Sequence, residues 1–333
     1  EAKFWKRLGE VITFKDFRDK KFVEELAKPD NPKVIRVLVI RFMDFYSRLA
    51  KQAKKVKTNA SKETDWRRSD DEAMQKVLDT LSRHHGVDFS SYKKTTLARR
   101  IHRRLQLSGA RNAHAYAERV RSDPEESKLL FNDLLIGVTE FFRDTAAYRK
   151  LAEAIDESLF RDDATEIRVW VAGCASGEEA YSVAMLLDEA RAARQWKGRI
   201  RVFATDIHQE ALRQASAGVF PAESLRKVSR ERRQRYFTED GPTLRVVDAL
   251  RDMIVFASHN LVANAPFTQL DLICCRNVLI YLQPPTQARV LGLFHFGLRT
   301  GGLLFLGPSE TLGKFDDEFE PVSAECKIFS KRR

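Results

Sequence analysis

The residues best suited to do chemistry lie between positions 167 and 206. Residues 174–177 form a tight loop after Gly173, Glu178 follows at the start of an expected helix, and Asp206 ends an apolar run. A carboxylate at the end of a strand can accept hydrogen bonds from both hydroxyls of a ribose. This spacing predicts a site for a cofactor that contains a nucleoside. An ordinary glycine turn before an acidic helix start is the alternative, and the dinucleotide fingerprint G-x-G-x-x-G is absent.

These residues need a particular set of elements to bring them together. Residues 167–173, IRVWVAG, have the composition of a buried parallel strand that stops at glycine. Glu178 and Glu179 then open a helix, because carboxylates suit the positive end of the helix dipole. Residues 200–205 read as a second strand that runs into Asp206. Strand, turn, helix, strand and acid together predict the nucleotide-binding half of an open α/β sheet.

A basic helix expected within residues 88–109 provides a second group of candidates. Leu97, Ile101 and Leu105 would form one apolar stripe of this helix. Another face would carry four arginines: Arg99, Arg100, Arg103 and Arg104. Like charges on one face repel one another unless an acidic partner meets them. We therefore expect a docking face for an acidic substrate, with a solvated surface helix as the alternative.

Four stretches resemble motifs of the chemotaxis-receptor (CheR-type) methyltransferase family, in the order that the family has them. They are DFSSYKKTTLARRIHRR from residue 88, DLLIGVTEFFRD from residue 133, GCASGEEAYS from residue 173 and FTQLDLICCRNVLIYL from residue 267. The resemblance covers roughly residue 71 to the C-terminus. It departs from the family at Ala180, where proline is usual, and at Gly137, where some relatives have asparagine.

The resemblance implies a fold and a division into domains. We expect an α/β fold, a class I (Rossmann-like) methyltransferase domain with an inserted small antiparallel β-subdomain, preceded by an all-helical N-terminal domain. The catalytic domain would span residues 151–333, with the β-subdomain at about 221–258, and the helical domain residues 67–150. Residues 1–66 remain an unassigned basic helical segment and linker.

The cofactor that the resemblance implies is S-adenosylmethionine, with S-adenosylhomocysteine as product. The residues expected to bind it are Gly137, Thr139, Arg143, Gly173, Glu178, Asp206, Asn260, Leu261, Arg276 and Asn277. Arg143 and Tyr281 are the candidates to hold the acceptor carboxylate in catalysis, while Arg99, Arg100, Arg103 and Arg104 would bind the substrate. Each of these residues alone could equally be structural, and Tyr281 could be a strand aromatic.

The implied reaction makes glutamate methyl esters on the acidic, helical cytoplasmic regions of bacterial chemoreceptors, as adaptation in chemotaxis. A glutamate side chain, with an unperturbed pKa of about 4.3, is ionised at neutral pH and needs no general base. The protein must orient the carboxylate and exclude water. The lack of an obvious His/Asp pair agrees with this chemistry.

Composition limits the other classes of function. The chain has 333 residues and a formal net charge of +11, and residues 1–66 hold 17 Lys/Arg against 10 Asp/Glu. A basic balance suits an acidic partner, although it can also serve solubility alone. The four cysteines, Cys174, Cys274, Cys275 and Cys326, lack metal-ligand spacing and read as reduced thiols of a cytoplasmic protein. No metal site, secretory signal or membrane span is expected.

Two rival functions stay open. One is a methyltransferase of the same fold that acts on a signalling protein outside chemotaxis, and the other is a scaffold or sensor that only binds S-adenosylmethionine. A nucleic-acid partner is not expected, because only the charge suggests it and the N/D-P-P-Y/F signature of amino-group methylation is missing. The oligomeric state, the acceptor, the role of residues 1–66 and any docking of a receptor tail on the β-subdomain stay undetermined.

Overall fold

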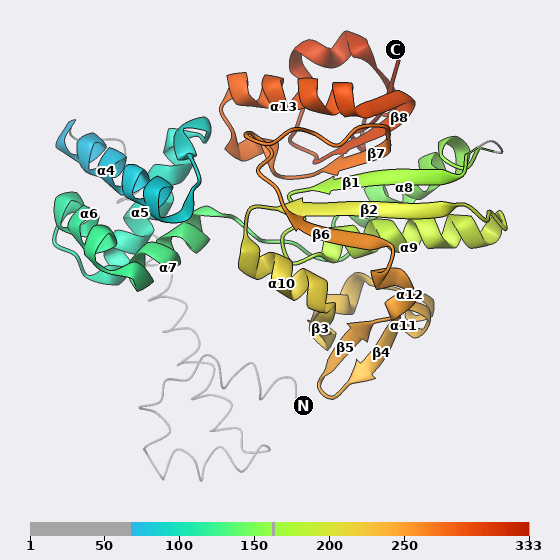
Figure 1. Ribbon diagram of the computed structural model, residues 1–333, viewed down its shortest axis with the longest axis horizontal. Coiled ribbons are helices and arrows are strands. Elements are labelled where there is room, and N and C mark those ends of the chain that lie inside the picture. Colours follow the sequence, from blue (N-terminus) through green and yellow to red (C-terminus); the bar gives the residue numbers. More distant parts are fainter. Residues whose placement is uncertain (1–67, 162–163, 333) are drawn as a thin grey trace, which may run out of the picture. The chain divides into compact units, whose positions relative to one another are not determined.

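The computed structural model describes residues 68–161 and 164–332, so the segment expected over residues 1–66 lies outside the described residues. Residues 72–333 form one compact unit. Within it, a helical part precedes a twisted sheet with helices packed on both faces, as Figure 1 shows. The described helices include none long and apolar enough to cross a membrane.

The helical part consists of α4 (Arg68–His85), η2 (Phe89–Ser91), α5 (Lys94–Ser108), α6 (Ala113–Ser122) and α7 (Pro124–Leu134). Local sequence sets its boundaries: Gly109 ends α5 in the left-handed conformation, and Asn112 and Asp123 cap α6 and α7 with their side chains. Their apolar faces meet in one core that contains Phe89 and Tyr116. The prediction of an all-helical N-terminal domain is therefore confirmed.

The main sheet has seven strands in the order β6-β2-β1-β7-β8-β10-β9. Five run parallel: β6 (Ile254–Ser258), β2 (Arg199–Asp206), β1 (Glu166–Ala172), β7 (Leu270–Cys275) and β8 (Leu298–Leu306). The last two, β10 (Ile328–Lys331) and β9 (Phe319–Ser323), pair antiparallel. Both strands expected from the apolar runs are present with almost the expected bounds, and the predicted α/β class is confirmed.

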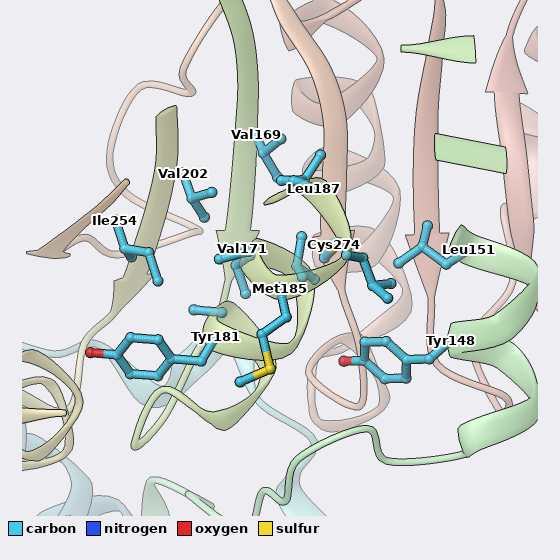
Figure 2. Packing of buried hydrophobic residues seen from close by; sticks show 14 of the residues in the cluster. Tyr148, Leu151, Val169, Val171, Tyr181, Met185, Leu187, Val202, Ile254 and Cys274 are labelled. Atoms are coloured by element: carbon cyan, nitrogen blue, oxygen red, sulfur yellow. The ribbon is translucent and has the colours of Figure 1, made fainter. Parts of the chain in front are cut away.

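Alternate residues of the strands face two separate cores. Val169 and Val171 of β1 pack with α8 (Thr145–Ser158) and α9 (Glu178–Ala193), as Figure 2 shows. Trp170, between them in sequence, packs on the opposite face with α13 (Pro284–Gly297). Both faces of these strands are covered, which explains why they read as continuous apolar runs rather than as alternating patterns.

Helix α8 belongs to the layer that covers the sheet. Its residues Tyr148 and Leu151 lie in the same core as β1 and α9 (Figure 2). The chain between the end of α7 and the start of α8 has no regular structure. We therefore place the boundary between the helical and the catalytic domain before α8, upstream of the expected position 151.

A small antiparallel sheet of three strands, β3 (Val219–Pro221), β5 (Thr243–Val246) and β4 (Phe237–Asp240), is inserted between α10 (Gln209–Ala217) and β6. It carries η3 (Ala222–Lys227), α11 (Arg230–Tyr236) and α12 (Asp248–Arg251), seen beside it in Figure 1. Arg232 of α11 forms two hydrogen bonds, of 2.8 and 2.7 Å, to Glu189 of α9. The predicted inserted β-subdomain is thus confirmed, and this contact ties it to α9.

Candidate functional site

A cleft opens at the carboxyl ends of the parallel strands, where the strand order reverses between β1 and β7. It has a volume of about 770 Å³ including its open mouth, which suits a small-molecule site. Residues from the helical domain and from the sheet line it together: Tyr92, Leu134, Leu135, Ile136, Gly137, Gly173, Thr205, Asp206, Ile207, His208, His259, Asn260, Leu261, Val262, Asn277, Val278, Tyr281 and Leu282. Open α/β sheets bind their ligands at this position.

The structure brings most of the cofactor-binding and catalytic candidates into this cleft. The lining includes Gly137, Gly173, Asp206, Asn260, Leu261, Asn277 and the catalytic candidate Tyr281. The other four of these candidates do not line it: Thr139, Arg143, Glu178 and Arg276. The roles of all these residues toward a ligand remain predictions, but the two groups differ in what they contact.

Asp206 connects the two loops that follow β1 and β2. Its carboxylate accepts a hydrogen bond from the backbone N–H of Ala175 on one oxygen and from that of His208 on the other, both at 2.9 Å. Each oxygen keeps a lone pair, because a carboxylate can accept about four hydrogen bonds. Asp206 can therefore hold the glycine loop and still accept two hydroxyls from a diol.

Gly173 is required by a close approach at the floor of the cleft. Its φ angle is +78°, and a Cβ atom built on it would lie 2.5 Å from a methyl carbon of Val278. An alanine at this position would meet both strain and a clash. The glycine therefore lets the Val278 side chain pack directly against the backbone of this loop.

Arg276 is enclosed behind the cleft. Its side chain is 1% exposed and donates to Asp144 at 2.7 Å and to the backbone carbonyl of Arg143 at 3.0 Å. Its guanidinium also lies over the rings of Tyr148 and Phe305. These contacts fix the loop that carries Arg143, so they give Arg276 a positioning role beside its predicted role in binding.

Arg143 lies in a strained loop next to the site. Phe142 and Asp144, on either side of it, have φ angles of +48° and +61°. One Nη atom of Arg143 donates to the carbonyl of Val138 at a long 3.4 Å. Such strain at non-glycine residues costs on the order of 1–3 kcal/mol each and concentrates at functional sites.

The two glutamates at the start of α9 are both buried. Glu178 accepts a hydrogen bond of 2.7 Å from the Ser176 hydroxyl, and burial raises its pKa above the ordinary value. Burial raises the pKa of Glu179 to about 7, while Arg276, whose closest nitrogen is 4.0 Å away, acts in the opposite direction. Glu178 therefore contacts the glycine loop through Ser176, and its role toward the cofactor stays a prediction.

The most important residue that sequence reasoning missed is Glu310. It is 3% exposed and accepts four backbone hydrogen bonds of 2.6–3.0 Å, from Asn277, Val278, Leu279 and Gly307. Three of these groups belong to the segment that leads to Tyr281. Burial raises the pKa of Glu310, and the four N–H groups act in the opposite direction. An acid that follows the last apolar strand run, in GPSE, was the only signal in the sequence.

Tyr92 was also missed as part of the site. It pairs with Leu282 in an antiparallel bridge, and the Lys93 N–H donates to the carbonyl of Tyr281 at 2.9 Å. Burial and the charge of Asp206 raise the pKa of the Tyr92 phenol to about 12. The helical domain therefore contributes directly to the wall of the cleft.

The four arginines of α5 divide into two pairs. Arg104 is largely buried and forms two hydrogen bonds, of 3.1 and 2.7 Å, to Glu126 of α7, while Arg100 donates to the carbonyl of Asp133 at 2.7 Å. Arg99 and Arg103 are exposed. The expected face of four free arginines therefore needs correction: two of them hold α5 against α7, because their partners lie on a helix that the α5 sequence does not reveal.

The described residues hold no group of three or more histidine, cysteine or acidic side chains that could bind a metal ion. Cys174, Cys274 and Cys275 are buried free thiols, and Cys326 is half-buried and free.

This fold and cleft define a class I methyltransferase domain joined to a helical domain. Residues 137–328 match the family described as CheR methyltransferase, SAM binding domain, and residues 72–135 match the one described as CheR methyltransferase, all-alpha domain. The chain belongs to the CheR methyltransferase family, and its cofactor is S-adenosylmethionine.

Individual relatives agree with this assignment. An uncharacterized 104.1 kDa protein of Rhodobacter capsulatus is 39% identical over 79% of this chain but only 28% of its own length. Cher3 of Pseudomonas putida is 32% identical over 79% of this chain and 98% of its length, and a chemotaxis protein methyltransferase of Listeria monocytogenes is 32% identical over 70% and 87%.

Similarity to solved structures is more distant. The N-methyltransferase NodS of Bradyrhizobium japonicum, in complex with S-adenosyl-L-homocysteine, is 15% identical over 50% of this chain and 62% of that chain. Its TM-score is 0.31, which is too low to support an argument about this chain.

The residues of the cleft fit the cofactor. Asp206 presents a carboxylate with free acceptor capacity, and the backbone of Gly173 lines the cleft beside it. The side-chain carbonyl of Asn277 is buried without a hydrogen-bond partner in the described structure. Asp206 would hold the ribose diol, and Asn260, Leu261 and Asn277 the rest of the nucleoside. The cofactor supplies an activated methyl group when bound.

The role of Glu310 can be tested by Glu310→Gln. The amide nitrogen cannot accept a hydrogen bond, so two of the four N–H groups would lose their partner and the segment leading to Tyr281 would loosen. We expect the Kd for S-adenosylhomocysteine to rise about tenfold, measured by calorimetry. Glu325→Gln, at an exposed position, is the matched control. Equal affinity in both variants would mean that Glu310 does not shape the site.

The raised pKa of Glu179 predicts that the stability of the folded protein depends on pH. Because its pKa is raised from 4.5 to about 7, the folded protein keeps a proton there that the unfolded chain has lost between these pH values. Stability should therefore fall as pH rises through this window, by on the order of 3 kcal/mol. Glu179→Gln cannot ionise and should lack this component. Urea unfolding of both proteins from about pH 4 to about pH 8 measures it, and parallel curves would contradict it.

Proposed function

We propose that this protein transfers the methyl group of S-adenosylmethionine to glutamate carboxylates on acidic helical regions of chemoreceptors, in the cytoplasm. The observation that carries the proposal is that Tyr281 and Asp206 line one cleft in a chain of the CheR family. A donor held at Asp206 and an acceptor held at Tyr281 would thus share one cleft. The relatives described as chemotaxis protein methyltransferases support this activity.

The chain's own groups would orient the acceptor rather than activate it. An ionised glutamate is already nucleophilic and has only to be positioned and desolvated. The Tyr281 hydroxyl can donate a hydrogen bond to it, and the Arg143 guanidinium can pair with a carboxylate. Arg143 has only one long hydrogen bond to the protein among the described contacts, so its guanidinium retains donors for an anion.

Incubation with methyl-labelled S-adenosylmethionine and receptor cytoplasmic domains tests the function. We expect base-labile methyl groups on glutamates of the acceptor, because carboxylate esters hydrolyse in base. Asp206→Ala should abolish the incorporation while the thermal unfolding transition is retained. Cofactor binding without any incorporation would favour the scaffold or sensor, and esters on a different signalling protein would favour the rival acceptor.

The two exposed arginines of α5, Arg99 and Arg103, allow a test of whether the acceptor is an acidic helix. Arg99→Glu/Arg103→Glu should spare cofactor affinity and lower methylation of an acidic helix about tenfold at low salt, because attraction between complementary surfaces speeds encounter. Raising the salt concentration should slow the wild type and have little effect on the variant. Arg111→Glu/Arg121→Glu, at exposed positions elsewhere in the helical domain, changes the net charge equally. Equal loss in both variants would show that only net charge matters.

A further inference from the structure

His208 is a cleft residue whose imidazole is fixed by the start of a helix. It is the N-cap of α10, and its Nδ1 atom accepts a hydrogen bond of 3.0 Å from the backbone N–H of Ala211. Serine, threonine, asparagine and aspartate are the usual residues at this position. Histidine can do the same with one ring nitrogen, which leaves the second nitrogen for another partner.

The cap determines which nitrogen carries the proton. A nitrogen that accepts a hydrogen bond must be unprotonated, so the neutral ring holds its proton on Nε2. Across residues 68–161 and 164–332, no hydrogen bond to this Nε2 is formed, and it is not among the buried unpartnered atoms. His208 is half-buried, and its Nε2–H is an oriented donor without a hydrogen-bond partner among the described residues.

This donor lies close in the chain to the expected diol site. The backbone N–H of His208 donates to Asp206 at 2.9 Å, so one short turn holds the carboxylate and the imidazole. Both residues line the same cleft, together with the apolar residues Leu135, Ile207 and Val262. Next to such apolar residues, a polar atom of a ligand that finds no partner loses affinity.

We propose that His208 is a specificity-determining residue that donates its Nε2–H to an unprotonated ring nitrogen of the adenine base. Adenine presents such acceptors at N1, N3 and N7, whereas its exocyclic amine is a donor and cannot accept this proton. This proposal rests on the proposed function, in which Asp206 holds the ribose of the cofactor. It adds the residue that would recognise the base. His208 would help to select adenine over bases that present a ring N–H at the same point.

His208→Asn separates the donor from the cap. Asparagine is a good N-cap, so α10 should keep its first turn, while the shorter side chain loses the Nε2–H. The affinities of wild type and variant are measured by calorimetry for S-adenosylhomocysteine and for its 1-deaza, 3-deaza and 7-deaza analogues, each of which replaces one acceptor by C–H. His114→Asn, at an exposed position of α6, is the matched control.

We expect one analogue to bind the wild type and the His114→Asn control about tenfold more weakly than S-adenosylhomocysteine does. The His208→Asn variant should bind S-adenosylhomocysteine about tenfold more weakly and should no longer discriminate against that analogue. The same discrimination in the variant as in the wild type would overturn the proposal, and so would a wild type that discriminates against no analogue.

A third variant, Asp206→Ala, tests the placement of the nucleoside separately from the role of His208. Asp206→Ala should lose affinity for S-adenosylhomocysteine whether or not His208 contacts the base. If Asp206→Ala binds as the wild type does, the placement of the nucleoside fails and the His208 proposal fails with it. If Asp206→Ala loses binding while His208→Asn keeps both affinity and discrimination, only the role of His208 is refuted.

Discussion

The hydrogen bonds of one buried carboxylate set the shape of the cleft. Glu310 follows β8 and accepts four backbone N–H groups, three of them from the segment after the neighbouring strand β7. Asn277 in that segment has a φ angle of +60°, and the N–H groups of Asn277, Val278 and Leu279 all reach the Glu310 carboxylate. Gly307 must be glycine there, because a Cβ atom would lie 2.8 Å from the Asn277 nitrogen. The position of Tyr281 therefore depends on Glu310.

Asp206 plays the corresponding part on the other side of the cleft. Its carboxylate holds the loop after β1 and the turn into α10, while Glu310 holds the turn after β7. Loops at the ends of parallel strands have backbone N–H groups without ladder partners, and a buried carboxylate can satisfy several of them at once. Both sides of the cleft are thereby ordered before a ligand binds, which lowers the entropic cost of binding.

Sequence reasoning succeeded where the signal is local. The apolar runs at 167–173 and 200–205 predicted β1 and β2, and Asp206 follows from the end of the second run. It did not reveal contacts between residues that are distant in the chain. Arg276 stands at a strand end, yet its side chain is buried and donates to Asp144, 132 residues earlier. Arg104 belongs to a basic face by its spacing, but Glu126 of α7 pairs with it. The spacing of residues along a helix shows which side chains share a face. It does not show which other helix packs against that face.

The bridge between Tyr92 and Leu282 connects the exposed arginines to the chemistry. The hydrogen bond from Lys93 to Tyr281 fixes the start of α5 to the segment that Glu310 orders. A helix rises about 1.5 Å per residue, so Arg99 and Arg103 lie roughly 8 and 14 Å along α5 from Lys94. An acidic helix that presents one glutamate to Tyr281 would meet them about two turns away. In the proposed function, the contact that completes the cleft would thus set the distance between the acceptor glutamate and the exposed arginines.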